Sequence, residues 1–176
     1  DYGASEMQGY IPDSPENNFC TLNPLAATSS FTATEGALRW TSSSYSYQGT
    51  TATIGMPTSG KWYFECYIVT AGAATSHDFG IGVVSIDDDG SDGDSANNNV
   101  HNNGAFYVTR RDSGSRIEKN LSTLFIGDTY SYTSDAIVSC AFDADSGKVW
   151  FARNNVWWNA SGGTNGDPSA GTNNTT

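Results

Sequence analysis

The chain has 176 residues, a length that fits one domain with a two-layer core. Charged residues make up 15% of it and the net charge is -11, because 19 acidic residues outnumber 8 basic ones. This balance repels a phosphate backbone, so we expect no nucleic-acid partner. No apolar run reaches the roughly 20 residues that span a bilayer, so we expect no membrane insertion.

The N-terminal part shows little regular periodicity. Residues 1–36 contain three prolines with scattered Gly and Asn, and predict an irregular arm that packs on the core. Short strands are expected at Leu38–Trp40 and Thr50–Ile54, separated by a polar loop that carries Tyr45 and Tyr47.

The best-patterned stretch is residues 61–69, which follow the chain-breaking Gly60. Every second residue is apolar: Trp62, Phe64, Cys66 and Ile68. The opposite face carries Lys61, Tyr63, Glu65 and Tyr67. A period of two predicts a strand with one buried and one partly wet face. We expect it to be the central strand, with Trp62 in the core.

The middle of the chain alternates strand signals with turns. Glycines occupy alternate positions in F-G-I-G-V-V at 79–84, which predicts a strand close to another backbone. A long loop rich in Asp, Asn and Gly covers 87–104. Strand signals resume at 105–109 and around Ile117, and residues 121–132 are mixed.

The last third predicts a hairpin. Ala136–Phe142 is an apolar strand, D-A-D-S-G is a turn, and Lys148–Arg153 is its partner. Asn154 and Asn155 tolerate the positive φ of a tight turn before Val156–Trp158. Short strands without a helical period predict an all-β fold, an antiparallel β-sandwich of two sheets.

The three cysteines, Cys20, Cys66 and Cys140, are odd in number and widely spaced, which argues against a disulfide framework. Cys66 and Cys140 lie on apolar strand faces, where free thiols are common. A bridge between them is the less favoured alternative.

Three segments resemble the SPRY domain family: S-G-K-W-Y-F-E at 59–65, F-G-I-G-V-V at 79–84 and I-V-S-C-A-F-D-A-D-S-G-K-V-W-F-A-R-N-N at 137–155. The hairpin positions that match are Asp143, Gly147, Phe151 and Asn154, whereas Asn155 stands where the family usually has Gly. The resemblance covers 37–168 and implies a concanavalin-like (jelly-roll-type) sandwich that binds partners without catalysis. It leaves 169–176 as a polar tail: either a segment is missing, or another chain completes the sheet edge.

Residues 17–25, N-N-F-C-T-L-N-P-L, add a narrower resemblance when they precede T-A-T-I-G at 51–55 and the S-G-K-W-Y strand. Together they look like SPRY-like segments of tailed-bacteriophage virion proteins. This implies an extracellular particle as the location and a tail, fibre or capsid-decorating role. The partners would be other virion proteins or a host-surface receptor.

Two charged clusters are candidate sites. The aspartates of the long loop offer hard oxygen ligands suited to calcium: Asp87, Asp89, Asp92 and Asp94. No Glu closes a twelve-residue EF-hand loop there, which favours a solvated loop and no cofactor. Arg110 and Arg111 belong to a basic cluster that either grips an acidic partner or neutralises the acid loop.

Aromatic residues supply the other binding candidates. Trp157 and Trp158 are adjacent, so a strand points them to opposite sides. An exposed one, with Tyr45 and Tyr47, would stack on a sugar or anchor a protein partner; core packing of both is the alternative.

Catalysis is not expected. Glu65 has no neighbouring acid pattern of a glycosidase, and the two histidines have no nucleophile elbow or zinc spacing. We therefore expect a non-catalytic interaction module of a phage virion, acting in host attachment or assembly, with homo-oligomerisation left open. The alternatives are a peptide-binding adaptor domain of a cytoplasmic protein and a carbohydrate-binding module.

Overall fold

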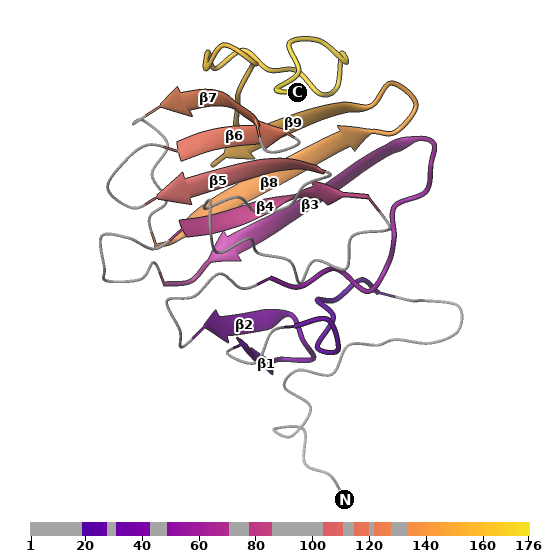
Figure 1. The fold of residues 1–176 in the computed structure, drawn as a ribbon, viewed down its shortest axis with the longest axis vertical. Coiled ribbons are helices and arrows are strands. Elements are labelled where there is room, and N and C mark those ends of the chain that lie inside the picture. Colours follow the sequence, from indigo (N-terminus) through magenta and orange to yellow (C-terminus); the bar gives the residue numbers. More distant parts are fainter. Residues whose placement is uncertain are drawn as a thin grey trace, which may run out of the picture. The chain divides into compact units, whose positions relative to one another are not determined.

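The computed structural model describes residues 19–27, 31–42, 49–70, 78–85, 104–110, 115–119, 122–127 and 134–176. The chain divides into two compact units. One comprises Asp1–Gly55 with Ile86–Asn99, and the other Met56–Ser85 with Val100–Thr176. Throughout the described part, the regular structure is antiparallel β-strand (Figure 1). The expected all-β sandwich fold is confirmed.

In the first unit, β1 (Phe31–Thr34) and β2 (Arg39–Ser42) form a hairpin. The Phe31 and Trp40 rings meet edge to face at 5.5 Å, and Trp40 Nε1 donates to Ala37 O at 2.9 Å. The expectation of an irregular arm up to residue 36 is therefore wrong for β1. The expected strand at 50–54 is also wrong, because only an isolated bridge joins Leu22 and Ala52 there.

The first sheet of the second unit has the order β10-β9-β8-β3. Its strands are β3 (Lys61–Ile68), β8 (Ala136–Asp143), β9 (Lys148–Arg153) and β10 (Val156–Trp157). The strand expected to be central, β3, lies at the edge of this sheet, and β8 and β9 lie inside it. The burial explains the difference: four successive residues of β8, from Val138 to Ala141, are buried, whereas β3 is mostly exposed. A continuous apolar run, rather than an alternating one, marks an interior strand.

The second sheet has the order β4-β5-β6-β7, so each strand pairs with the next along the chain. Its strands are β4 (Asp78–Val84), β5 (Gly104–Arg110), β6 (Ser115–Lys119) and β7 (Ser122–Gly127). The register between β6 and β7 shifts at Ile117 and Glu118. A bulge of this kind bends a sheet and increases its twist.

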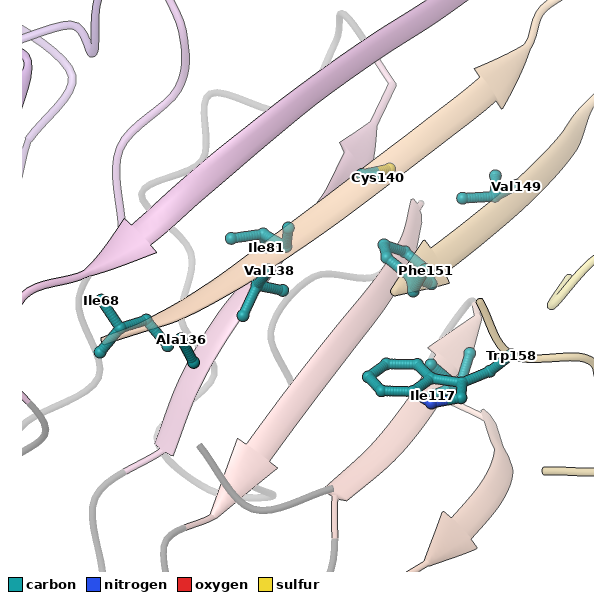
Figure 2. Packing of buried hydrophobic residues seen from close by; sticks show 9 residues of the cluster. All are labelled: Ile68, Ile81, Ile117, Ala136, Val138, Cys140, Val149, Phe151 and Trp158. Carbon is teal, nitrogen blue, oxygen red and sulfur yellow. The ribbon is translucent and has the colours of Figure 1, made fainter. Parts of the chain in front are cut away.

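The core of this unit lies between the two sheets. Figure 2 shows buried side chains from both: Ile81 and Ile117 come from the second sheet, whereas Val138 and Phe151 come from the first. Trp158, which follows β10, belongs to the same cluster. Trp62 does not, because its side chain is 38% exposed. The expectation that Trp62 is a core residue is wrong: its position at the start of an edge strand keeps it outside the cluster.

The last residues of the chain cover the edge of β9 beyond the short β10. Val149 N donates to Thr176 O at 3.2 Å, and Thr175 N donates to Val149 O at 2.8 Å. The Thr175 hydroxyl accepts from Phe151 N at 3.1 Å and donates to Trp158 O at 3.0 Å. Thr175 has no exposed surface. The residues expected as a polar tail thus complete this sheet edge from within the same chain.

The turn between β9 and β10 gives a first testable prediction. Asn154 and Asn155 have φ of 49° and 64°, as expected from the sequence. Alanine pays roughly 1–2 kcal/mol in the left-handed region. Asn155→Ala should therefore lower the free energy of unfolding by about 1 kcal/mol, measured by urea denaturation. Asn155→Gly is the matched control and should cost nothing; equal losses would contradict the argument.

Candidate interaction face

Many of the sequence-predicted site residues lie outside the described part of the chain: Tyr45, Tyr47, Arg111, Asp87, Asp89, Asp92 and Asp94. Arg110 ends β5 and pairs in register with Asp78 of β4. The proposals that these residues bind sugars, acidic partners or calcium remain predictions. In the part of the chain that is described, no three His, Cys, Asp or Glu side chains gather as metal ligands.

The two adjacent tryptophans point in opposite directions. Trp158 is only 2% exposed and packs in the core, so it is not available to a partner. Trp157 is half-buried and pairs with Ala152 on the outer face of the first sheet. Only Trp157 of this pair stays a binding candidate.

On the outer face of the first sheet, the two middle strands carry small residues. Glu65, Ser139, Ala152 and Trp157 are directly opposite one another across the four strands. Ser139 and Ala152 in the middle are buried. Their small size lets larger side chains from the flanking strands lie over the sheet. The Tyr63 and Trp157 rings approach each other to 6.3 Å between centroids, tilted by 54°.

Tyr63 is anchored by its hydroxyl. It donates to Glu65 Oε2 at 2.6 Å and is hydrogen-bonded to Ser139 Oγ at 3.2 Å. Tyr67, four residues along β3 on the same face, donates to Asp135 Oδ1 at 2.6 Å. Both tyrosines are 57% exposed. Each therefore holds a fixed direction while presenting much of its ring to solvent. We call Tyr63, Glu65, Tyr67, Asp135 and Trp157 the tyrosine face.

The C-terminal segment covers the outer side of β9. Trp150 Nε1 donates to Thr172 O at 2.9 Å, and Lys148 Nζ donates to Gly171 O at 2.9 Å. Trp150 is thereby buried on the outer side of β9. The open part of the outer face is consequently the part next to β3.

The carboxylates raise the pKa of both tyrosines. The hydrogen bond to Glu65 raises the pKa of Tyr63, and the bond to Asp135 raises that of Tyr67, because each stabilises the protonated phenol. A raised folded-state pKa means that the bond contributes to stability below the ordinary value of 10.0. That contribution is lost as the pH rises through the folded-state pKa.

These bonds predict an altered alkaline titration. Asp135→Asn should lower the pKa of Tyr67 towards its ordinary value, since the amide no longer attracts the phenolic proton as a carboxylate does. Ultraviolet absorbance of tyrosinate measures this, and Tyr67→Phe identifies the signal. If Tyr67 titrated identically in the wild type and in the Asp135→Asn variant, the hydrogen bond would not exist in solution.

All three cysteines are free. Burial raises the pKa of the Cys66 thiol to about 11, and it raises that of Cys140 further still. The reactive thiolate form is thus suppressed near neutral pH. The bridge between Cys66 and Cys140 is absent, and the two thiols belong to the core rather than to a nucleophilic site.

The sequence identified one side of this face but not its partners. The period of two predicts Lys61, Tyr63, Glu65 and Tyr67 on the wet face of one strand. Of the tyrosine face, the sequence singles out only Trp157 as a binding candidate. Ser139 and Asp135 are 76 and 68 residues away from their tyrosine partners. No local sequence pattern predicts such contacts, because they depend on the pairing of β3 with β8.

In the described segments there is no helix long and apolar enough to cross a membrane. No protein-family model matches this chain, and a search of curated proteins found no match.

Proposed function

We propose that this chain is a non-catalytic interaction module of a bacteriophage virion protein. It would serve as a tail, fibre or capsid-decorating component in host-surface attachment or virion assembly. The observation that carries the proposal is the tyrosine face. Two half-exposed tyrosines of β3 are held by Glu65 of the same strand and by Asp135, just before β8. They suit binding because little conformational freedom remains to be lost. Tyrosine and tryptophan are also the side chains enriched at binding hot spots.

The virion assignment rests on the resemblance of residues 17–25 and 51–55 to phage sequences. These two segments are hydrogen-bonded in this fold. Asn23 N donates to Thr51 O at 2.8 Å, and Thr53 N donates to Thr21 O at 2.8 Å. Thr21 N also donates to Thr53 Oγ1 at 3.0 Å. These hydrogen bonds support the interpretation that the two segments form one structural motif and are not two unrelated sequence matches.

The non-catalytic part of the proposal is supported by two carboxylates and two thiols in the described part of the second unit. The Glu65 and Asp135 carboxylates each accept a tyrosine hydroxyl, and the buried thiols are protonated. These arrangements fix geometry instead of leaving a group free to exchange protons with a substrate.

The test is to locate the chain and then to compete with it. A gold-labelled antibody against the chain should mark intact virus particles from the source culture. Excess purified chain should slow adsorption of those particles to host cells if the role is attachment; labelled particles with unchanged adsorption indicate assembly. Label confined to cell cytoplasm would refute the virion assignment and favour the adaptor alternative.

Tyr67→Ala should weaken this competition, or particle binding if the role is assembly, because it removes an exposed ring without touching the core. Leu25→Ala is the matched control, since Leu25 is 96% exposed but lies in the other unit. If both variants lost binding equally, or if neither lost any, the tyrosine face would not be the binding surface.

A carbohydrate ligand is the second candidate, favoured by the contact between Tyr63 and Trp157 beside Glu65. Aromatic rings stack on the apolar face of a sugar, and a carboxylate accepts its hydroxyls. A glycan array probed with the purified chain tests it. Binding that survives Tyr63→Ala, or no binding to any glycan, would exclude this site as a sugar site.

A further inference from the structure

The two edges of the first sheet of the second unit are treated differently. The β9 edge is covered by the chain's own residues Thr175 and Thr176. At the other end, no strand among the described residues pairs with the free side of β3. β3 is eight residues long, regular in register and free of proline. Such an edge is a template for pairing with another strand.

The hydrogen bonds show which groups point out of this edge. Ala144 N donates to Gly60 O at 2.9 Å, and Asp135 N donates to Ile68 O at 2.7 Å, so the even-numbered carbonyls face β8. Direction alternates along a strand. The backbone groups that point away from β8 therefore belong to the odd-numbered residues: Lys61, Tyr63, Glu65 and Tyr67.

We propose that a second copy of this chain pairs with β3 in antiparallel fashion, about a two-fold axis at Tyr63. In such a pairing Lys61 of each copy lies directly opposite Glu65 of the other. No other centre on the strand gives this match: an axis at Glu65 or at Lys61 would oppose like charges. A two-fold axis makes the contact self-complementary, so the favourable pair occurs twice.

Backbone and side chains agree with this register. The pairs Lys61–Glu65 and Tyr63–Tyr63 join outward-pointing groups, and each such pair exchanges two hydrogen bonds. On the other side of the sheet the register sets Trp62 opposite Phe64 of the second copy. Trp62 is the large apolar side chain that stands 38% exposed at this edge, while Phe64 is half-buried. The pairing accounts for an apolar position that the single copy leaves wet.

The experiment is a concentration series by sedimentation velocity on the full 176-residue chain. The wild type should form a dimer. Lys61→Glu and Glu65→Lys should each raise the dimer dissociation constant about tenfold, because each opposes like charges twice. The double variant Lys61→Glu/Glu65→Lys restores opposite charges and should return the constant to within about threefold of the wild type.

A monomer at every concentration overturns the proposal. So does a dimer that neither single variant weakens, or a loss that the double variant fails to restore. Lys61 also lies opposite Asp143 within its own sheet, so thermal melts must accompany each variant. The double variant still carries the change at Lys61. If its dimer is restored, the loss in Lys61→Glu came from the pairing and not from a folding defect.

Amide hydrogen exchange gives an independent readout on the wild type. The amides of Tyr63 and Glu65 should become protected as the concentration rises through the dimer range. The amides of Phe64 and Cys66 already bond to β8 and should not change. Protection that appears in neither set, or equally in both, contradicts pairing at this edge.

Discussion

Trp158→Ala should lower the free energy of unfolding by about 3–5 kcal/mol, the range for deleting a buried aromatic ring. Trp158 is 2% exposed and packs with core residues of both sheets of the second unit. Its neighbours belong to a rigid sandwich, so they can close only part of the cavity left behind.

Trp62→Ala is the matched comparison, because it deletes the same ring from a different environment. Trp62 is 38% exposed, and its Nε1 donates to Ser59 O at 2.9 Å. The loss should be smaller, about 1–3 kcal/mol, because the ring is only partly buried and contributes one such hydrogen bond. Urea denaturation followed by circular dichroism measures both.

Trp158→Phe keeps most of the apolar volume and should recover part of the loss. Because the chain has two compact units, fluorescence and circular dichroism must give coincident transitions before one free energy is assigned. Equal losses for Trp158→Ala and Trp62→Ala would contradict the placement of these two rings.

The hairpin of β8 and β9 is predictable from the sequence because neighbouring residues determine its turns. An Asp-rich turn ends in Gly147, and Asn154 and Asn155 provide the positive φ of the next turn. Strand boundaries there agree with expectation to within one residue. The position of a strand within its sheet is a different matter. The alternation in β3 states which side is apolar, but it does not state whether a neighbour covers the strand's free side.

Trp62 shows the physical consequence. Period two placed it correctly on the side of Phe64, Cys66 and Ile68, yet burial falls from Ile68 towards the strand's beginning. That gradient depends on where the facing sheet ends, which is a tertiary property. The tyrosine face is only partly predictable from the sequence. The alternation within β3 gives its strand positions, but the hydrogen-bond partners Ser139 and Asp135 come from a distant part of the sequence.

The burial of the C-terminal residues was the least predictable feature. The segment is rich in Gly, Asn and Thr, a composition typical of a solvated tail. Its order comes from hydrogen bonds to β9 and from Lys148 and Trp150, which bond the carbonyls of Gly171 and Thr172. These bonds require the hairpin to exist first. The resemblance predicts a sheet edge that needs covering, but it assigns the cover to a missing segment or another chain.

Deleting Asn174–Thr176 should therefore destabilise the second unit by about 3 kcal/mol. The deletion removes the Thr175 side chain, which has no exposed surface, together with its bonds to Phe151 N and Trp158 O. It also removes the backbone bonds to Val149. Each of these five bonds contributes about 1 kcal/mol, and the conformational entropy that the deleted residues no longer lose on folding offsets part of the sum. Loss of the cover also exposes the β9 edge, so the shortened chain should aggregate at lower temperature.

Two substitutions separate the hydroxyl from the rest of the segment. Thr175→Val keeps the shape but loses both hydroxyl bonds, and should cost about 1–3 kcal/mol. Thr175→Ser keeps the hydroxyl and loses one methyl group, and should cost about 1 kcal/mol. Urea denaturation ranks the three variants, and light scattering during heating reports aggregation. If the deletion were as stable as the full chain, the C-terminal residues would not hold the edge of β9, and the contrast between a covered β9 edge and an open β3 edge would lose its basis.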